Sequence, residues 1–395
     1  MPVNLFRMQR YCLALMGHQD IYDNNVLPKV VKNSKYYYRY YCQMFKNVIL
    51  LLVMVSAQFP MMDYIIYHID ELALATASLS IVFTNLLTVI KTSTFLAHKQ
   101  EFKRLMANFE LMYDELNIPG AKQALISANI NAKRFVKLYF YSVSCTALYF
   151  TINPLISMIW VKFQGKPLLM QLPMPMRFRF EFESTPGYQF AYIYTIIVTF
   201  AVVMHATSVD GLFTSFTTNL RGHLQALQYF IETNTFENKS DTLLKHELAS
   251  YVKYHMHLLA MSRRVEKIFK PIIFGQFLIT SLLVCVIIYQ LVTHMGILME
   301  MVVYCSFLSS ILLQLLIYCY GAEIVKIESL AIGTAVQTSQ WYNLPPRHRY
   351  VLGMMLQRSQ REVIISAGVY EASLGSFLNI LKAAMSYITF IQSIE

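Results

Sequence analysis

Charged residues are scarce in this chain of 395 residues, where Asp, Glu, Lys and Arg together make up only 14%. Apolar residues make up 56%, against roughly 45–50% apolar and about 25% charged in a typical soluble domain. This balance excludes a disordered chain, which needs many charges and few apolar residues. It also argues against an ordinary soluble protein. The composition instead indicates a single polytopic membrane domain over residues 1–395.

Catalytic and metal-binding motifs are absent from the sequence. None of GxSxG, GxxxxGKS/T, HExxH and GxGxxG occurs. His255 and His257 are two apart and would face different sides of a helix. No pair of cysteines has CxxC spacing, and none lies in a loop predicted outside the cell; the six are Cys12, Cys42, Cys145, Cys285, Cys305 and Cys319. We therefore expect no enzyme activity, no metal, no cofactor and no stabilising disulfide.

Seven apolar stretches approach the roughly 20 residues that a helix needs to span a bilayer. They are 47–67, 72–97, 133–160, 187–217, 271–293, 297–320 and 365–394. Charges within them are few, with Lys91, Asp210 and Lys382 the notable ones, and no internal repeat is visible. Both observations disfavour a transporter, which typically carries intramembrane charges and inverted repeats. The predicted fold class is therefore an all-α membrane protein with seven transmembrane helices.

Basic residues predict the orientation of these spans. Of the 33 Lys and Arg residues, 26 fall in 1–46, 98–134, 218–270 and 321–364, which share one side of the membrane. The opposite side has four, all in 161–186. The positive-inside rule then places the N-terminus in the cytoplasm and the C-terminus outside. This orientation is the inverse of a metabotropic seven-helix receptor, and it explains the net charge of +10 without a nucleic-acid partner.

The loops divide into a cover and an anchor. Segment 161–186 is the only long outer loop, and its four prolines predict a rigid, non-helical cover. Segment 218–270 repeats apolar residues at helical spacing, as at Leu244, Leu248 and Leu258. We interpret it, together with 321–364, as helices that project into the cytosol as an anchor. Pro271 suits a boundary or a kink before the fifth span.

Short motifs in the last third of the chain resemble those of insect odorant receptors. In order, they are YCYGAE at 318–323, SQWY at 339–342 and FLNILKAAMSY at 377–387. VEKIF at 265–269, GQF at 275–277 and LPMP at 172–175 add to the match, as does Lys91 in the second span. Each motif alone is weak, but the collinear set agrees with the inverted seven-span topology. The sequence is therefore identified as similar to the insect odorant receptor family.

The resemblance implies a ligand-gated, non-selective cation channel that forms tetramers with an odorant receptor co-receptor. It also implies a plasma-membrane location on the dendrites of olfactory sensory neurons, and a small volatile ligand. Segment 218–270 is too short for the cytoplasmic insertion of the co-receptor, which favours a ligand-tuned subunit. Related gustatory receptors usually end in a Thr-Tyr…Gln-Phe pattern, whereas this chain has Ser386-Tyr387 and Gln392-Ser393. A gustatory receptor is the alternative, and a metabotropic receptor a more distant one.

The last helix is the predicted pore helix. A stripe of side chains spaced along one helical face starts small and polar and ends apolar, with Tyr387 and Ser393 beside it: Asn379, Ala383, Ser386, Phe390 and Ile394. In four copies it would form a conduit that a hydrophobic ring can close by dewetting. The resemblance assigns Phe390, Ser393 and Ile394 to the narrowest part. The alternative is that this face packs on another helix. Lys382 lies beside the stripe. Its alternative roles are a functional one, snorkelling toward the membrane surface, or an ion pair with Glu371.

The resemblance places the ligand pocket in the outer half of the second, third, fourth and sixth spans. The residues at that depth are rich in aromatics and hydroxyls and carry no formal charge: Leu79, Ser80, Phe83, Thr146, Tyr149, Phe150, Asn153, Tyr192, Ile196, Thr199, Met301 and Tyr304. We expect a neutral ligand such as an ester, ketone, alcohol or aromatic compound, because an acid or amine needs a partner charge. For each residue, ordinary packing between helices is the alternative role.

Overall fold

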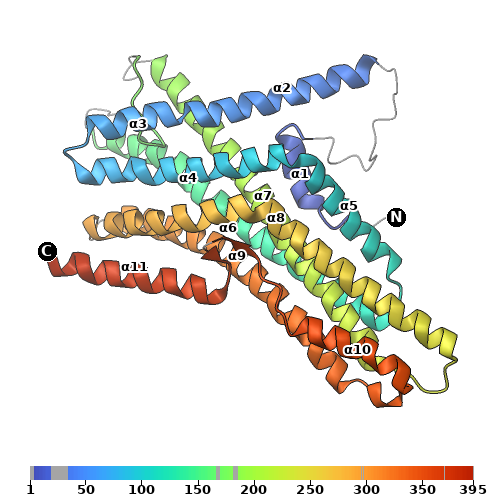
Figure 1. The fold of residues 1–395 in the computed structure, drawn as a ribbon. Helices are drawn as coiled ribbons and strands as arrows, with labels where there is room; N and C mark the ends of the chain where they lie inside the picture. Colours follow the sequence, from blue (N-terminus) through green and yellow to red (C-terminus); the bar gives the residue numbers. More distant parts are fainter. Residues whose placement is uncertain are drawn as a thin grey trace.

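The computed structural model describes residues 4–18, 34–165, 170–180, 186–294, 296, 298–368 and 370–394. The chain is almost entirely helical (Figure 1). Its elements are α1 (Arg7–Leu15), α2 (Ser34–Ser56), α3 (Gln58–Tyr67), α4 (Leu72–Ala97), α5 (Lys99–Glu115), α6 (Pro119–Phe163), α7 (Gly187–Thr233), α8 (Asp241–Thr293), α9 (Leu298–Thr338), the 3-10 turn η2 (Trp341–Asn343), α10 (Pro346–Ser359), β1 (Ser366–Ala367), β2 (Tyr370–Glu371) and α11 (Leu374–Ile394).

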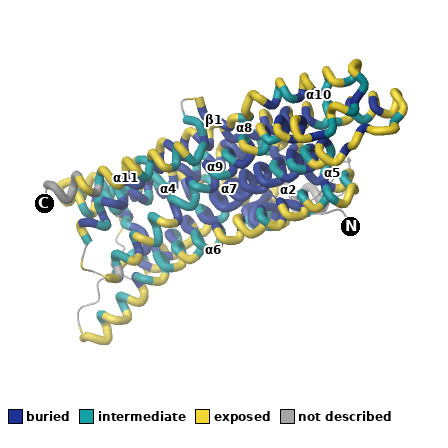
Figure 2. Tube along the Cα trace, turned by 90° about the horizontal axis from the view of Figure 1, so that it is seen from below, coloured by how far each residue is buried: buried dark blue, intermediate teal, exposed yellow. Residues whose placement is uncertain are grey.

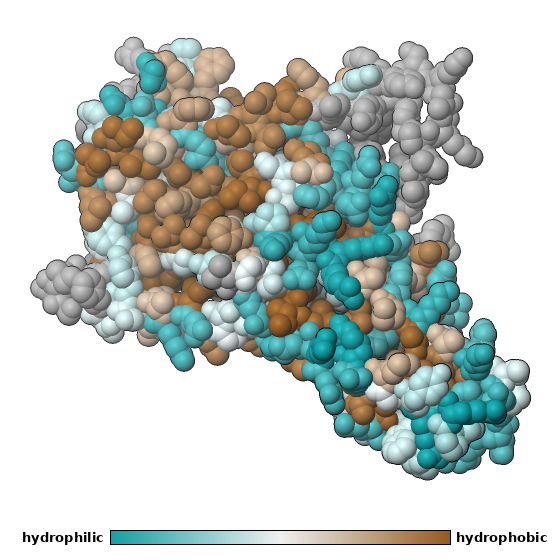
Figure 3. Space-filling view, viewed as in Figure 1, coloured by the Kyte–Doolittle hydropathy of each residue, from teal (hydrophilic) through white to brown (hydrophobic). Residues whose placement is uncertain are grey.

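The helices form a broad part that continues into a narrower stem (Figure 1). We call residues 99–132, 218–270 and 321–359 the stem; they comprise α5, α10 and one end of each of the long helices α6 to α9. Apolar side chains cover much of the broad part, and hydrophilic ones cover much of the stem (Figure 3). Within the described residues, six helices are long and apolar enough to cross a membrane. With α11, whose 21 residues are also mostly apolar, the helices match the predicted seven spans.

Helix α7 is the central element of the fold. Every residue from His205 to Leu220 is buried, and the helix is packed by α1, α4, α6, α8 and α9 (Figure 2). A helix buried on all sides needs small or apolar residues around its whole circumference. Close approach of α9 depends on Gly321, because a Cβ there would lie 2.7 Å from the Thr217 hydroxyl oxygen. The core therefore forms around α7 rather than between two layers.

Phenylalanines fill the junction between the broad part and the stem. The ring of Phe269 on α8 lies 5.0 Å from Phe213 on α7 and 5.4 Å from Phe102 on α5. Phe216 on α7 lies 5.6 Å from Phe109 on α5. Large rings in edge-on and stacked contacts bury much apolar area per residue. This cluster holds α5 against the bundle although α5 is too polar to span a membrane.

The predicted anchor segment and the predicted fifth span are parts of one continuous helix. Helix α8 runs without interruption from Asp241 to Thr293, so it passes straight through Pro271. Proline removes one backbone hydrogen bond in a helix interior. Here the buried side chains on both sides of it, Ile268 and Ile272, keep the helix docked on the core. Of the two predicted alternatives for Pro271, a boundary or a kink, the structure excludes the boundary, because Pro271 lies inside one continuous helix.

Three further segments differ in detail from the prediction. The first span is divided at Ala57 into α2 and α3. The segment after the second span, 98–132, is mostly helical, because α5 and the start of α6 lie in it. The last helix begins at Leu374 rather than at residue 365. An antiparallel β1–β2 hairpin precedes α11, and Gly368 at φ +74° allows its turn.

The predicted cover, 161–186, was expected to be non-helical, but residues 161–163 still belong to α6. Its described residues 170–180 are non-helical and pack against the broad part of the bundle. Its Pro175 carbonyl accepts a hydrogen bond from Ser78 of α4 at 3.1 Å. The backbone N–H of Arg177 donates to the Pro60 carbonyl at 2.9 Å. Met174 and Met176 of this segment are buried. This segment therefore closes the end of the bundle that lies away from the stem.

Candidate functional site

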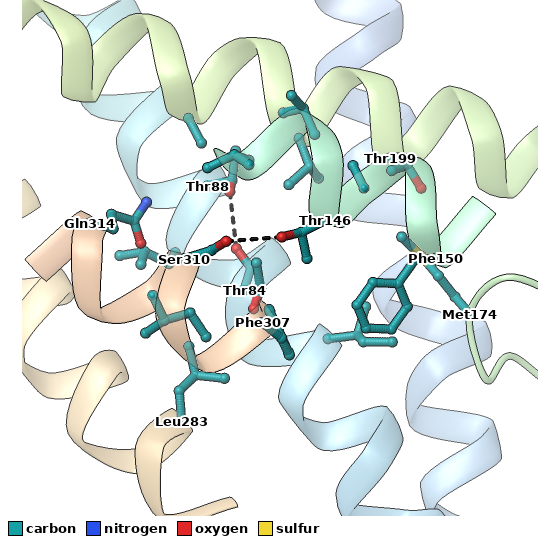
Figure 4. Close-up of a pocket in the computed structure, with 18 of the residues that line it drawn as sticks. Thr84, Thr88, Thr146, Phe150, Met174, Thr199, Leu283, Phe307, Ser310 and Gln314 are labelled. Atoms are coloured by element: carbon teal, nitrogen blue, oxygen red, sulfur yellow. Dashed lines mark hydrogen bonds between the residues drawn. The ribbon is translucent and has the colours of Figure 1, made fainter. Parts of the chain in front are cut away.

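A cavity of about 120 Å³ lies in the broad part, between α4, α6, α7, α8 and α9 (Figure 4). Its wall is apolar apart from a few hydroxyls, one phenol and one amide, and it carries no formal charge. It is lined by Ile81, Thr84, Leu87, Thr88, Tyr139, Val143, Thr146, Ala147, Phe150, Met174, Thr199, Val202, Val203, Ala206, Leu283, Phe307, Ser310, Ile311 and Gln314. Concave, mostly apolar cavities with a few convergent polar groups are typical of small-molecule sites.

The two ends of the cavity differ. Toward the cover lie Phe150 and Phe307, whose rings meet nearly edge to face at 5.7 Å, together with Met174 from the cover itself. Toward the stem lie Tyr139 and Gln314. A ligand would therefore meet aromatic and thioether groups at one end and polar groups at the other.

The threonines of the wall turn their protons away from the cavity. The hydroxyl of Thr84 donates to the Ser80 carbonyl at 2.9 Å, and that of Thr88 donates to the Thr84 carbonyl at 3.0 Å (Figure 4). The hydroxyl of Thr199 likewise donates to the carbonyl of Thr195 at 2.8 Å. A hydroxyl that donates to its own helix still has acceptor lone pairs. These side chains therefore offer acceptors rather than donors to a ligand.

A buried cluster of charged and polar groups joins five helices at the stem end of the cavity. The ammonium of Lys91 on α4 lies 2.6 Å from the Asp210 carboxylate on α7, and both side chains are 0% exposed. The hydroxyls of Tyr318 on α9 and Tyr139 on α6 donate to the same carboxylate at 2.5 and 2.7 Å. Gln314 donates to it as well, at 2.8 Å. A buried ion pair is tolerated when additional hydrogen bonds satisfy both charges, as they do here for Asp210.

The cluster extends to α8 and leaves no free donor at the cavity floor. The amide of Gln276 on α8 donates to the Gln314 side-chain oxygen at 3.2 Å and to the Thr280 hydroxyl at 2.8 Å. Gln314 also donates to the Tyr139 hydroxyl at 2.8 Å. We call Lys91, Tyr139, Asp210, Gln276, Gln314 and Tyr318 the polar cluster. Because Tyr139 and Gln314 line the cavity, the polar cluster forms part of its wall.

Of the twelve residues predicted to contact the ligand, Thr146, Phe150 and Thr199 line this cavity. Phe83 and Tyr304 pack in a neighbouring apolar cluster that also contains Phe307 of the wall. The other seven lie outside the lining; Leu79, Tyr149, Asn153 and Met301 are half-buried, Ser80 and Tyr192 are buried, and Ile196 is exposed. The phenol of Tyr192 donates to the Thr151 carbonyl. Ligand contact by the twelve residues therefore remains a prediction.

Sequence reasoning missed the deeper part of the wall. The α4 residues Thr84 and Thr88 lie one and two turns beyond Ser80, and their i, i+4 spacing is the signal that extends the pocket toward the stem. Gln314 and Ser310 on α9 show the same spacing. The sequence shows Lys91 and Asp210 as intramembrane charges. It does not indicate that they pair, because they are 119 residues apart.

Helix α11 packs on the bundle by one face only. Ala384 is buried against Val284 and Ile288 of α8, and Tyr387 packs half-buried against the same cluster. Asn379, Ala383 and Ser386 are exposed, so the structure does not pack this predicted stripe against another helix of the same chain. The side chains of Phe390, Ser393 and Ile394 lie outside the described part of the structure.

Two nearby charges bear on the interpretations of Lys382. Lys382 itself is exposed on α11. Glu371 accepts a salt bridge from Lys326 at 3.2 Å instead. Lys326 also pairs with Glu362 at 3.0 Å, so it ties α9 to the segment before the β hairpin. Within the described residues, the proposed Lys382–Glu371 pair is therefore not formed.

The long apolar helices and the one-sided packing of α11 define a polytopic helical membrane protein with an uncharged cavity. The chain belongs to the odorant receptor family, because residues 71–385 match the family model described as 7tm Odorant receptor. It is 42% identical to Odorant receptor 82a of Drosophila melanogaster over 397 residues, which are 99% of each chain. It is 27% identical to Odorant receptor 47a of the same species, over 86% of this chain and 90% of that one.

Solved structures of an insect olfactory receptor have the same fold. The olfactory receptor OR5 from Machilis hrabei in complex with eugenol matches with a TM-score of 0.81 at 15% sequence identity, covering 100% of both chains. A second structure of OR5 from Machilis hrabei matches with a TM-score of 0.78. At this identity the likeness establishes the fold alone. The relatives are receptors rather than enzymes.

Proposed function

We propose that this chain is the ligand-binding, tuning subunit of an odorant-gated, non-selective cation channel. It assembles with an odorant receptor co-receptor, as a tetramer, in the plasma membrane of olfactory sensory neuron dendrites. Its N-terminus and stem lie in the cytoplasm, and α11 contributes to the pore. The observation that carries the proposal is the uncharged cavity of about 120 Å³ in a chain that matches odorant receptors over its full length.

The cavity supports a small, neutral ligand. Its volume is comparable to the roughly 150 Å³ of an engineered apolar cavity that binds benzene. A charged ligand would lose its hydration without meeting a counter-charge, because the Lys91 and Asp210 charges already compensate each other. Aromatic rings and a thioether at the cover end suit the apolar portion of a volatile compound.

The hydrogen-bonding pattern narrows the ligand class further. The hydroxyls of Thr84, Thr88 and Thr199 donate their hydrogen bonds to carbonyls of their own helices. The amide of Gln314 donates to Tyr139 and Asp210. The polar atoms that face the cavity are therefore mainly oxygen atoms that can accept a hydrogen bond. A ligand that donates a hydrogen bond, such as an alcohol or a phenol, would satisfy these acceptors. An ether or ketone of the same skeleton would gain no such bond.

Whole-cell current recording tests the proposal. The chain is expressed with and without an insect odorant co-receptor, with G-protein signalling blocked, and exposed to volatile alcohols and their matched methyl ethers. We expect a fast cation current that depends on the co-receptor and is larger for the alcohols. Loss of the response under the G-protein block would overturn the channel mechanism. A full response without the co-receptor would overturn the heteromeric assembly.

A pair of α4 variants tests the ligand class. Thr88→Val removes an acceptor from the cavity wall but keeps the shape of the side chain. Losing one hydrogen bond of about 1–1.5 kcal/mol should weaken the alcohol response about 5- to 10-fold and leave the ether response unchanged. Thr92→Val is the matched control, because Thr92 is buried on the same helix but does not line the cavity. Equal effects of the two variants would contradict the assignment.

A further inference from the structure

The exposed face of α8 changes from basic to apolar along a single line. Arg263, Arg264, Lys267 and Lys270 are exposed and lie at helical spacing, so their side chains share one face of the helix. The same line continues with Phe274, Leu278 and Leu282, which are 42–45% exposed. We call the four basic residues the α8 basic stripe.

The basic stripe lies where the surface changes character. Along α8, apolar side chains of the broad part give way to hydrophilic side chains toward the stem (Figure 3). Exposed leucines and phenylalanines that continue into Lys and Arg mark the depth at which a helix leaves the hydrocarbon region, where basic side chains extend toward the headgroups. The basic stripe is therefore at the level of lipid phosphates.

A second element brings two more arginines to this surface. Arg358 near the end of α10 donates to the Arg361 carbonyl at 2.9 Å. Partial burial lowers the pKa of Arg358, and the positive charges of Arg263 and Arg361 lower it further. Helix α10 packs directly against α8, which agrees with this mutual effect of Arg263 and Arg358.

No carboxylate of the described chain compensates these charges. None lies within salt-bridge distance of the basic-stripe nitrogens or of Arg358 and Arg361 among the residues that the structure describes. The nearby acidic groups are already engaged. Glu362 and Glu371 pair with Lys326, and Glu266 accepts a hydrogen bond from Ser366 at 3.1 Å. Six basic side chains that lack a carboxylate partner repel one another unless an anion binds between them.

We propose that the α8 basic stripe, with Arg358 and Arg361, binds the polyanionic headgroup of a phosphoinositide in the cytoplasmic leaflet. Clusters of four to eight basic residues immediately cytoplasmic of a membrane helix are typical of such lipids. The headgroup would bridge α8 and the end of α10, while its acyl chains would lie along Phe274, Leu278 and Leu282. Because α10 leads through the β hairpin into α11, the lipid would also fix the connection to the last helix. The proposal rests on the cytoplasmic orientation of the stem given above.

Lipid binding can be measured without any channel current. The purified full chain in phosphatidylcholine nanodiscs is titrated with a fluorophore-labelled phosphatidylinositol 4,5-bisphosphate that carries its acyl chains. We expect saturable binding that the Arg263→Gln/Lys267→Gln variant weakens roughly 30-fold, from the contribution of about two basic residues near an anionic headgroup. The matched control is Lys245→Gln/Lys253→Gln, which removes two exposed charges from the stem portion of the same helix and should bind normally. Unchanged elution in size-exclusion chromatography shows that each variant is folded.

Two outcomes would overturn the proposal. Equal weakening by the control variant would show a diffuse charge effect rather than a site. Equally tight binding of the soluble inositol phosphate headgroup, without acyl chains, would assign the surface to a free phosphate ligand instead of a membrane lipid. Neither outcome affects the odorant-gated current, so the proposed function is tested separately.

Discussion

The buried Lys91–Asp210 pair makes the sharpest stability prediction. Lys91→Met removes the counter-charge but leaves the Asp210 carboxylate buried among Tyr139, Tyr318 and Gln314, which are neutral donors. Removing one partner of a fully buried pair costs about 3–5 kcal/mol, because the other charge is left uncompensated. Hydrogen bonds from three neutral groups reduce this cost, so we expect the lower end of the range. A loss of that size is a large share of the total stability of a folded protein.

A double-mutant cycle separates the pair from its surroundings. Asp210→Asn alone leaves a buried ammonium, and Lys91→Met alone leaves a buried carboxylate. The double variant leaves neither charge, so its loss should be about 1–3 kcal/mol smaller than the sum of the two single losses. The free energy is read from denaturant unfolding of the full chain in detergent, together with the fraction that reaches the cell surface.

A surface lysine supplies the control for this cycle. Lys137→Met makes the same replacement at an exposed position of α6, two residues from Tyr139. It should change the unfolding free energy by less than about 0.5 kcal/mol. If Lys91→Met were no more destabilising than Lys137→Met, or if the two pair variants were additive, the reasoning about the polar cluster would be refuted.

Four further predictions concern the cavity, the pore helix, the N-terminus and the topology. Ala147→Phe fills the cavity and should raise the half-maximal odorant concentration at least tenfold while leaving surface expression unchanged; an unaltered dose–response curve would contradict the cavity assignment. Ala383→Cys should make the current sensitive to a charged thiol reagent, and insensitivity would favour the packing alternative. Glu110→Gln leaves the guanidinium of Arg10, 4% exposed, without its carboxylate, so limited proteolysis should release the N-terminal segment faster than in the parent chain. Asn238 lies in the only glycosylation sequon, on the predicted cytoplasmic side, so glycosidase treatment should not shift the mobility of the chain; a shift would reverse the orientation.

The all-helical fold with seven apolar spans was predictable from the sequence, and the match to solved olfactory receptor structures supports it. Hydropathy identifies spans because a backbone in lipid must satisfy its hydrogen bonds within a helix. Element boundaries were less predictable. The polar N-terminal segment of α1 docks on α7 through Gln9, which donates to the Gly211 carbonyl at 3.0 Å and to the Ser215 hydroxyl at 2.7 Å. No local pattern announces that contact.

For the cavity too, the sequence predicts the chemical character, and the tertiary structure decides which residues form the wall. The sequence and its family resemblance predicted an uncharged pocket rich in hydroxyls and aromatics, and the wall of the cavity has this character. Which residues line it was decided by the rotation and crossing of five helices, which moved the wall from Ser80 toward Thr84 and Thr88.

The polar cluster was decided by tertiary structure alone. The sequence determined that Lys91 and Asp210 lie within apolar spans, where each charge needs a partner. It could not select the partner, because the two positions are 119 residues apart and several polar groups were available. Only the packing of α4, α6 and α9 around α7 brings one ammonium, two phenols and one amide to a single carboxylate, and the cost of burying that charge is what makes the arrangement specific.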